Sequence, residues 1–481
     1  MYTKIARPAP VREGAPRINA PKIFGVTPKR EVLWHLPVAG ERPMSFEASG
    51  LPEGLYFDAE GNLHGRTEVE GDFAVEITVR NARGEAKHSL TLRVGKDAKR
   101  LTPLMGWCSW NAFQENINEQ VITGIADAFI EKGLIEYGYQ FVNLDSEWQG
   151  QYGGELNAIQ PNLLKFPDIK RMVDNIHARG IKCGIYSTPM LRSYNNGSNE
   201  STLPGCTRGK RDESDNVKCP FGIGKVHLEE NNVKQWCEWG FDYLKYDWGP
   251  YDFPNAEKMR KAIDKCADRD IIYCPVTGGP AEARKQISEI ADMWRWGPDS
   301  KPNFQNLLSL CFGRDECMNE TRLGHFFDLD MLEIGELKEW KNELTEDEMV
   351  IAYTQRAICS SPIQLSCDVR ALTDFELSLF CNEEVIAVNQ DSLGRAAFCI
   401  TEYKTRNEAT NAEEKHTKVY KKPLSDGSYA VAVYNLGCVS EEYTLECSYA
   451  RDLWAKEDLA IAENPISFTL APHTVKLFKI K

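Results

Sequence analysis

The chain has 481 residues and a formal net charge of −14, with 57 Lys and Arg against 71 Asp and Glu. At roughly 150 residues per domain this length predicts about three domains, although one α/β barrel can take up about 250 residues. An acidic chain without a cluster of cations is a poor candidate for nucleic-acid binding, which depends on releasing counterions from phosphates. The hydrophobic fraction of 42% is typical of a globular protein, and no apolar run reaches the roughly 20 residues that span a bilayer.

The chain contains 15 cysteines, none of them in a CxxC pair or a Cys/His cluster with zinc-binding spacing. We therefore expect no metal and no other cofactor. An odd number leaves at least one thiol unpaired, and we expect most of the cysteines to be reduced and buried as small apolar residues. Residues 1–26 contain no apolar stretch of the kind found in signal peptides. The expected location is periplasmic or extracellular, with the signal peptide lying outside this sequence, and a cytoplasmic location is the alternative.

Residues 1–97 carry short strand patterns separated by turns. Phe73–Val79 and Ser89–Val94 alternate apolar and polar side chains, which is typical of half-buried strands, and the turn sequence Asn81–Gly84 lies between them. The segment Gly50–Thr67 resembles the immunoglobulin-like modules appended to bacterial surface and carbohydrate-active enzymes. We therefore predict an N-terminal β-sandwich that acts as a structural spacer, with sugar binding as the alternative role.

From residue 98 to residue 393, strand-length apolar runs alternate with amphipathic segments. Several intervals have a helical pattern, for example Asn118–Lys132 and Thr345–Ala357, and Thr345 with Glu348 forms a capping-box pattern. No glycine-rich nucleotide-binding motif is present. Strands that alternate with helices in this number predict a (β/α)8 barrel. The eight predicted strands are Leu104–Trp107, Phe141–Asp145, Cys183–Ser187, Tyr243–Asp247, Ile271–Cys274, Met293–Trp296, Phe326–Asp330 and Ile363–Asp368.

Residues 394–481 return to strand patterns, with Ser428–Tyr434 and Val475–Ile480 as the clearest examples. The polar segment Thr405–Lys415 is predicted to be an exposed loop. We predict a C-terminal antiparallel β-sandwich. The predicted domains are therefore residues 1–97, 98–393 and 394–481.

Acidic residues gather at the ends of the predicted barrel strands, where the reactive groups of this fold lie. A single aspartate in such a place is more often a cap or turn residue, but five of the eight ends carry one, which favours a pocket lined by carboxylates. The sequence has no Ser-His-Asp arrangement, Cys-His pair or HExxH motif, so carboxylates combined with aromatic residues favour glycoside hydrolysis. The strand-end residues are Asp145, Asp247, Arg295 with Asp299, Asp328 with Asp330, and Asp368.

Five segments resemble, in chain order, signature sequences of glycoside hydrolase family 27, the α-galactosidase family. The resemblance implies a (β/α)8 barrel followed by a C-terminal antiparallel β domain. It also implies a retaining, exo-acting hydrolase that releases terminal galactose-type sugars from oligosaccharides or polysaccharides. The five segments are Leu101–Asn111, Tyr243–Asp247, Trp294–Asp299, Gly324–Leu332 and Asn382–Asp391.

Carried over to this sequence, the resemblance implies that Asp247 is the nucleophile and Asp299 the general acid/base. A retaining mechanism requires the two carboxyl groups to lie about 5–5.5 Å apart. Lys245 lies two residues before the nucleophile, so on a strand it points the same way and is expected to hold Asp247 ionised. Arg295 is expected to bond Asp299 or a sugar hydroxyl. Trp110 is expected to form an aromatic wall of the sugar site.

The family's sugar contacts are only partly kept in this sequence. Family members carry two consecutive aspartates for the 6- and 4-hydroxyls of the sugar, whereas Asp145 is followed here by Ser146, a shorter and neutral group. Glu147 comes next, but on a strand it would face the other way unless the chain bends. After Cys274, which we expect at the sugar site, Pro275 occupies the position of a Glu that many members place near the 2-hydroxyl.

Gly249 occupies the position of a cysteine that forms a common disulfide in the family, which agrees with mostly free thiols. These departures keep the reaction and leave the sugar open: β-L-arabinopyranosides, α-N-acetylgalactosaminides and isomaltodextran-type α-glucosides are the alternatives. A glycan-binding protein without hydrolytic activity is disfavoured, because both carboxylates are kept. The expected partner is a glycan, with no nucleic acid, and the oligomeric state stays open.

Overall fold

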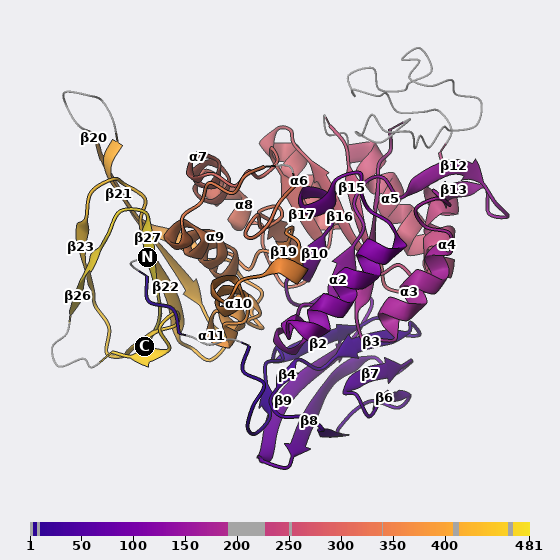
Figure 1. Ribbon diagram of the computed structural model, residues 1–481, viewed down its shortest axis with the longest axis horizontal. Coiled ribbons are helices and arrows are strands. Elements are labelled where there is room, and N and C mark those ends of the chain that lie inside the picture. The colour runs from indigo at the N-terminus through magenta and orange to yellow at the C-terminus, as the bar shows by residue number, and fades with distance from the viewer. Residues whose placement is uncertain are drawn as a thin grey trace.

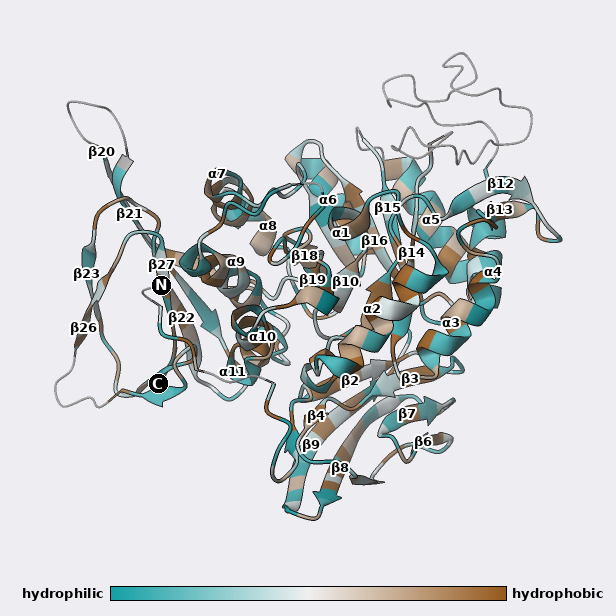
Figure 2. Cartoon of the chain, viewed as in Figure 1, coloured by the Kyte–Doolittle hydropathy of each residue, from teal (hydrophilic) through white to brown (hydrophobic). Residues whose placement is uncertain are grey.

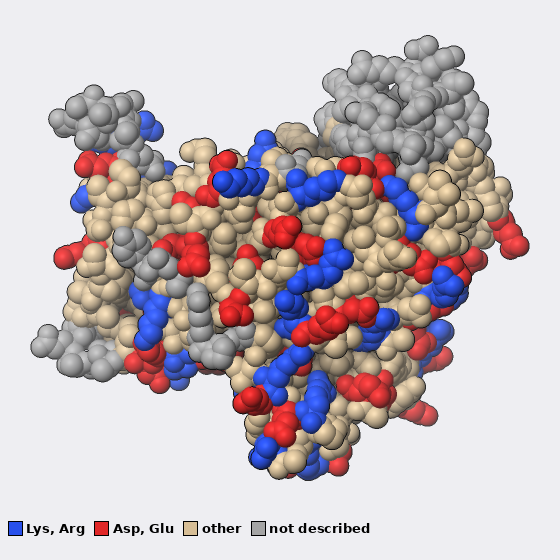
Figure 3. Space-filling view, viewed as in Figure 1, with Lys and Arg blue, Asp and Glu red and all other residues tan. Residues whose placement is uncertain are grey.

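The computed structural model describes residues 3–6, 10–190, 227–249, 253–338, 340–406, 413–459 and 465–481. Figure 1 shows a central barrel with helices around it, the N-terminal strands below it and the C-terminal strands on its left. Within these residues, no helix is both long enough and apolar enough to cross a membrane. Lys and Arg are interspersed with Asp and Glu over the face that Figure 3 shows, so no patch of a single sign dominates it.

The N-terminal strands form a four-stranded sheet in the order β2-β9-β8-β5, a three-stranded sheet in the order β3-β7-β6, and the pair β1-β4. Apolar side chains of both larger sheets, among them Trp34, Leu63 and Val75, share one core. The alternation along β8 and β9 that predicted two strands is visible in Figure 2. The strands are β1 Arg17–Ile18, β2 Ile23–Val26, β3 Val32–His35, β4 Val38–Ala39, β5 Ser45–Ser49, β6 Leu55–Phe57, β7 Asn62–Gly65, β8 Gly71–Asn81 and β9 Gly84–Val94.

The barrel is an eight-stranded parallel sheet in the order β18-β17-β16-β15-β14-β11-β10-β19. Each strand lies within one of the eight predicted runs or overlaps it, and β15 and β17 have the predicted bounds. The strands are β10 Met105–Cys108, β11 Phe141–Asn143, β14 Lys182–Ser187, β15 Tyr243–Asp247, β16 Ile272–Thr277, β17 Met293–Trp296, β18 Phe326–Asp328 and β19 Ile363–Leu365.

The barrel closes through residues that follow β18 rather than through β18 itself. Leu332 forms a parallel bridge to Leu365, and its N–H donates to the carbonyl of Gln364 at 2.7 Å. The strand ends at Asp328, two residues earlier than predicted, because Asp330 has a φ of +70° and turns the chain. The segment between β18 and Leu332 therefore crosses the mouth of the barrel.

The helices form where apolar side chains recur every three or four residues. In α3, Ile169, Met172, Val173 and Ile176 are buried and Asp168 caps the N-terminus. The capping box of Thr345 and Glu348 is confirmed. The helices are α1 Trp110–Phe113, α2 Glu119–Glu131, α3 Ile169–His177, α4 Glu229–Trp239, α5 Phe253–Cys266, α6 Ala281–Ile290, α7 Phe304–Leu307, α8 Asp315–Met318, α9 Glu346–Ile358, α10 Asp374–Phe380 and α11 Glu383–Asn389, with 3-10 turns at Leu134–Tyr137 and Val369–Ala371, a π turn at Leu308–Phe312, and the hairpin β12 Gln149–Gly153 and β13 Ala158–Pro161.

The C-terminal part is a six-stranded sheet in the order β20-β21-β22-β27-β24-β25 with the pair β23-β26 over it. The loop predicted for Thr405–Lys415 is corrected in part: its first and last residues end β20 and begin β21, and residues 407–412 lie outside the described residues. The polar sequence suggested a loop because the side chains at the described end of β20, residues 401–406, are exposed or half-exposed on both faces of the strand. The strands are β20 Phe398–Arg406, β21 Glu413–Pro423, β22 Tyr429–Asn435, β23 Glu441–Leu445, β24 Ala450–Asp452, β25 Glu457–Asp458, β26 Ile466–Leu470 and β27 Thr474–Ile480.

The sheet docks on the barrel through buried cations of β21. Lys418 Nζ donates to Asp315 at 2.6 Å and to the carbonyl of Phe312 at 2.9 Å. The Lys422 side chain is fully buried, and its Nζ donates to Ser360 Oγ at 2.6 Å. The 11 described cysteines from Cys108 to Cys399 are free, and nine of the 13 described cysteines are buried, as expected from the sequence; Cys206 and Cys219 lie outside the described residues.

Candidate active site

A cavity of about 490 Å3 opens at the carboxyl ends of the barrel strands. Seven of the eight predicted site residues line it, namely Trp110, Asp145, Ser146, Lys245, Asp247, Arg295 and Asp299. A second, larger cavity of about 700 Å3 lies between α11 and the two flanking β parts and contains none of them. The smaller cavity is the candidate site because it holds the reactive groups.

Strand β15 carries the predicted nucleophile into this cavity. Lys245 and Asp247 are two residues apart, so their side chains leave the same face of the strand, and both line the cavity. Burial raises the pKa of Asp247 to about 6, while the cations Lys245 and Arg295 act in the opposite direction. The carboxylate of Asp247 is therefore poorly hydrated, and two neighbouring cations stabilise its ionised form.

Lys245 itself is held by the carboxylate of Asp145, which follows β11, two strands away in the sheet. Its Nζ donates to Asp145 Oδ2 at 2.6 Å, and the thiol of Cys108 donates to the same oxygen at 3.1 Å. Burial alone would lower the pKa of Lys245, but the Asp145 carboxylate raises it above its ordinary value. Burial raises the pKa of Cys108 well above its ordinary value, so this cysteine stays a thiol. Asp145 and Lys245 are thus a buried, mutually bonded part of the cavity wall.

Ser146 lies beside Asp145 with its hydroxyl at the cavity. The residue is 3% exposed, and Ser146 Oγ has no hydrogen-bond partner within the described part of the chain. Glu147 does turn away from a strand path, with a φ of +84°, but its carboxylate accepts from Lys165 Nζ at 3.1 Å and does not line the cavity. Glu147 therefore does not replace the missing second aspartate.

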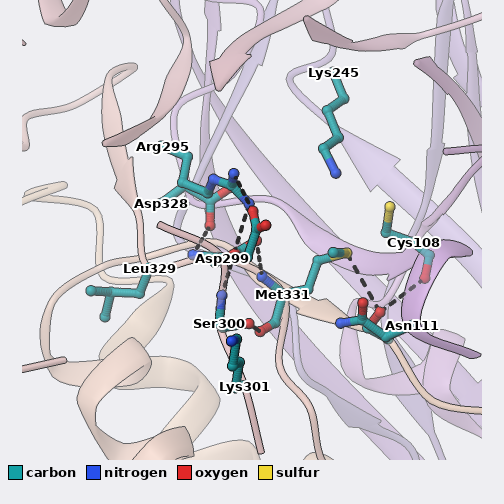
Figure 4. Close-up of polar contacts among 12 residues, drawn as sticks. Cys108, Asn111, Lys245, Arg295, Asp299, Ser300, Lys301, Asp328, Leu329 and Met331 are labelled. Carbon is teal, nitrogen blue, oxygen red and sulfur yellow. Dashed lines mark hydrogen bonds and ion pairs between the residues drawn. The ribbon is translucent and has the colours of Figure 1, made fainter. Parts of the chain in front are cut away.

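On the opposite side of the cavity, Arg295 joins two carboxylates. Its Nη2 donates to Asp299 Oδ1 at 2.7 Å, as predicted, and its Nη1 donates to Asp330 Oδ2 at 2.7 Å. Figure 4 shows Arg295 and Asp299 side by side, with Lys245 and Cys108 across from them. The side chain of Asp299 is 72% exposed, so it can reach both the substrate and water.

Three strand-end residues lie elsewhere than the sequence suggested. Cys274 is fully buried among apolar side chains in the middle of the barrel, with its thiol 3.9 Å from Asp328, and neither residue lines the cavity. The pocket role for Asp368 is wrong: it caps the turn that follows β19 and pairs with Arg370 at 2.6 Å. Strand β19 ends three residues before its predicted run does, and β16 continues three residues beyond its own, so the residues that reach the cavity depend on where each strand stops.

Sequence reasoning missed three glycines and eight other residues of the wall. Thr277 ends β16 with its Oγ1 buried and, within the described residues, unpartnered, and Glu333 accepts from Asn111 Nδ2 at 2.8 Å. Tyr186 lies within β14, and most of the others lie in the segments that follow strands, where no local pattern distinguishes them. The missed wall residues other than glycine are Asn111, Tyr186, Trp248, Thr277, Ser300, Met331, Glu333 and Trp340.

The described residues offer no cluster of three or more His, Cys, Asp or Glu that could hold a metal ion. The oxygens of Asp330 are already occupied: Oδ2 accepts from Arg295 and the Ser300 N–H, and Oδ1 accepts from the Met331 N–H. The cavity combines the carboxyl groups of Asp247 and Asp299 with the cations Lys245 and Arg295 and with aromatic walls.

Comparison with known proteins gives this arrangement a family. The family described as α-galactosidase A matches residues 102–196 and 209–391, and the α-galactosidase C-terminal β-sandwich domain matches residues 414–480. An α-galactosidase of Oryza sativa subsp. japonica is 30% identical to the chain, over 85% of this chain and 91% of that protein.

Solved structures agree over most of the chain. A candidate α-galactosidase of Bacteroides fragilis is 28% identical with a TM-score of 0.83, covering 98% of this chain and 99% of that one. A β-L-arabinopyranosidase of Geobacillus stearothermophilus is 26% identical with a TM-score of 0.66, covering 79% of this chain and 97% of that one. With the family match spanning more than half of its residues, the chain belongs to the α-galactosidase A family of glycoside hydrolases.

Proposed function

We propose that this enzyme is a retaining, exo-acting glycosidase that removes terminal galactose-type sugars from oligosaccharides or polysaccharides. One observation carries the proposal: Asp247 and Asp299 face the same cavity, and the guanidinium of Arg295 acts on both. It bonds Asp299 directly and lowers the pKa of Asp247 against the effect of burial. Two carboxyl groups in one sugar-sized cavity are the machinery of glycoside hydrolysis.

In the first step, the carboxylate of Asp247 attacks the anomeric carbon while Asp299 donates its proton to the departing glycosidic oxygen. The bond to the leaving group breaks as the bond from Asp247 to the sugar forms. In the second step, Asp299 takes a proton from water, and that water displaces Asp247 from the anomeric carbon. The exposure of Asp299 suits this exchange with water, and the poor hydration of Asp247 suits a nucleophile.

The contrast between the buried Asp145–Lys245 pair and the exposed Asp299 supports removal of a terminal sugar. Asp145 and Lys245 are buried and bonded to each other, so they offer a charged, preorganised contact to sugar hydroxyls. Trp110 supplies an aromatic surface on which a sugar ring can stack. We infer that the non-reducing sugar lies between these groups, with the rest of the glycan leaving past Asp299.

Because Ser146 departs from the family's pattern of sugar contacts, a second sugar is also a candidate substrate. A neutral hydroxyl replaces a carboxylate at the cavity wall, so the preference among hydroxyl patterns is weaker than charge-assisted contacts would make it. The similar β-L-arabinopyranosidase structure makes the corresponding pyranose without a hydroxymethyl group the best second candidate for this chain.

The test is a panel of nitrophenyl glycosides assayed side by side: α-galactoside, β-L-arabinopyranoside, α-N-acetylgalactosaminide and α-glucoside, with isomalto-oligosaccharides as unactivated substrates. We expect the highest kcat/KM on the α-galactoside and, by proton NMR, a first-formed product with the anomeric configuration of the substrate. If the enzyme hydrolysed none of these compounds, the proposed function would be overturned. A product of inverted configuration would overturn the proposed roles of the two carboxyl groups.

A further inference from the structure

The position of Asp299 needs an explanation, because packing does not supply one. Its side chain is 72% exposed, whereas catalytic groups have to be held within a fraction of an ångström of their working geometry. Asp299 lies three residues beyond β17, outside the sheet. Its placement therefore depends on the polar contacts of its carboxylate and of the backbone beside it.

Two of the donors in these contacts, Arg295 and the Ser300 N–H, share one oxygen atom of another residue. Asp330 Oδ2 accepts from Arg295 Nη1 at 2.7 Å, and the other arm of the same guanidinium bonds Asp299. Asp330 Oδ2 also accepts from the backbone N–H of Ser300 at 2.8 Å. Asp330 thus fixes both the side-chain partner of Asp299 and the peptide that follows it.

Asp330 is itself held in an unusual conformation. It is 3% exposed and has a φ of +70°, a region that costs a residue other than glycine about 1 kcal/mol or more. The buried guanidinium of Arg356 donates to the carbonyls of Leu329, Asp330 and Met331, all at 3.0–3.3 Å, and Asp328 Oδ1 accepts from the Asp330 N–H at 2.9 Å. Figure 4 shows Asp328, Leu329, Met331 and Ser300 grouped around the Arg295–Asp299 pair.

We propose that Asp330 is a positioning residue for the acid/base Asp299, acting through Arg295 and the Ser300 N–H. The turn at Asp330, with its unfavourable φ, places the carboxylate within hydrogen-bond distance of both donors at once. The proposal rests on the proposed function, since it takes Asp299 as the proton donor.

A positioning role has a kinetic consequence that a general structural role lacks. Protonation matters most for a leaving group that is a poor anion and least for one that leaves unaided. Loss of the Asp330 carboxylate should therefore slow the cleavage of an alkyl glycoside far more than that of a 2,4-dinitrophenyl glycoside. The ratio of kcat/KM between the two substrates isolates this effect, because kcat/KM reports the bond-breaking step when that step is the first irreversible one.

The experiment compares wild type, Asp330→Asn and Asp299→Ala on the 2,4-dinitrophenyl and methyl glycosides of the best sugar in the panel. Because a displacement of about 1 Å can cost about 100-fold, we expect Asp330→Asn to lower kcat/KM by about 30- to 100-fold for the methyl glycoside and by less than about 5-fold for the dinitrophenyl glycoside. Equal losses on both substrates would overturn the positioning role.

Asp292→Asn is the matched control. Asp292 is also a buried carboxylate beside β17, it accepts from the Tyr273 N–H at 2.7 Å, and it pairs with Lys99 at 2.8 Å, but it lies at the opposite end of the strand. Its loss should lower the melting temperature without changing the substrate ratio. A changed ratio in Asp292→Asn would show that the ratio responds to general damage, and would overturn the inference.

If Asp330→Asn does not fold, Arg295→Lys replaces it, since a lysine keeps the charge but lacks the planar, two-armed guanidinium that bonds Asp330 and Asp299 through separate nitrogens. It should give the same change in ratio. An Asp299→Ala enzyme whose ratio equals that of wild type would refute the acid/base role and with it the proposed mechanism. A changed ratio in Asp299→Ala with an unchanged ratio in Asp330→Asn would refute the positioning role alone.

Discussion

Replacing Ser146 by alanine should move stability and activity in opposite directions. Ser146 Oγ is buried at the cavity and has no partner in the part of the chain that the structure describes. A buried hydroxyl without a hydrogen bond costs about 1–3 kcal/mol. Ser146→Ala removes that cost from the free enzyme, so the free energy of unfolding should stay the same or increase by about 1 kcal/mol.

Ser146 lines the cavity, so a rotation of its side chain would offer the same hydroxyl to a sugar. A neutral hydrogen bond contributes about 0.5–1.5 kcal/mol, which corresponds to a loss of roughly 2- to 13-fold in kcat/KM when the bond is removed. The assay measures kcat/KM on the preferred nitrophenyl glycoside, and scanning calorimetry measures the melting temperature of the same preparations. We expect lower activity together with an equal or higher melting temperature.

Ser360→Ala is the matched control, because its buried hydroxyl accepts from Lys422 Nζ at 2.6 Å and donates to the carbonyl of Arg395 at 3.0 Å, far from the cavity. That variant should lose about 1–3 kcal/mol of stability, since it leaves buried polar groups unpaired, and should keep the wild-type kcat/KM. A lower melting temperature with unchanged kcat/KM in Ser146→Ala would refute the role we assign to this hydroxyl.

Three more predictions concern Asp247, Asp299 and Lys422. Because burial raises the pKa of Asp247 to about 6 and a nucleophile has to be ionised, kcat/KM should fall about tenfold per pH unit below about pH 6. Lys245→Met should move this fall to higher pH, because it removes a cation that favours the carboxylate. A profile that stays flat down to pH 4 would contradict the assignment of Asp247 as the nucleophile. Asp299→Ala should lower the cleavage of methyl glycosides by about 10²- to 10⁴-fold, and azide should restore turnover of the dinitrophenyl glycoside as a glycosyl azide; no response to azide would count against the acid/base role. Burial lowers the pKa of Lys422 from 10.5 to about 8, so between these pH values the unfolded chain binds more protons than the folded one and stability should rise with pH, by roughly 3 kcal/mol at most. Lys422→Met should flatten this rise in the melting temperature, and an unchanged slope relative to wild type would show that Lys422 is not its source.

The sequence predicted the barrel because its strands are short apolar runs separated by intervals long enough to hold a helix. It also predicted which side chains of β15 face the cavity, since Lys245 and Asp247 are two residues apart on one strand. These inferences depend only on local periodicity. They hold wherever a strand continues to the residue in question.

Periodicity gives no such guidance at strand ends. Asp368 and Asp330 are both the last residues of predicted strands, yet Asp368 caps a short turn and Asp330 turns the chain at φ +70° to accept from Arg295. That difference is set by Arg356, a residue of α9 whose guanidinium holds three consecutive carbonyls of the other segment. Contacts between residues this far apart in the chain leave no local pattern, so the positioning of Asp299 became visible only in three dimensions.

The most direct test of the mechanism is to trap the glycosyl-enzyme. Incubation with 2-deoxy-2-fluoro-α-galactosyl fluoride, followed by proteolysis and mass spectrometry, should show one fluorosugar per chain, attached to the peptide that contains Asp247. The Asp247→Asn enzyme should not acquire the label. A fluorosugar attached to any other carboxylate, or a turnover product of inverted configuration with no trapped adduct, would contradict Asp247 as the nucleophile.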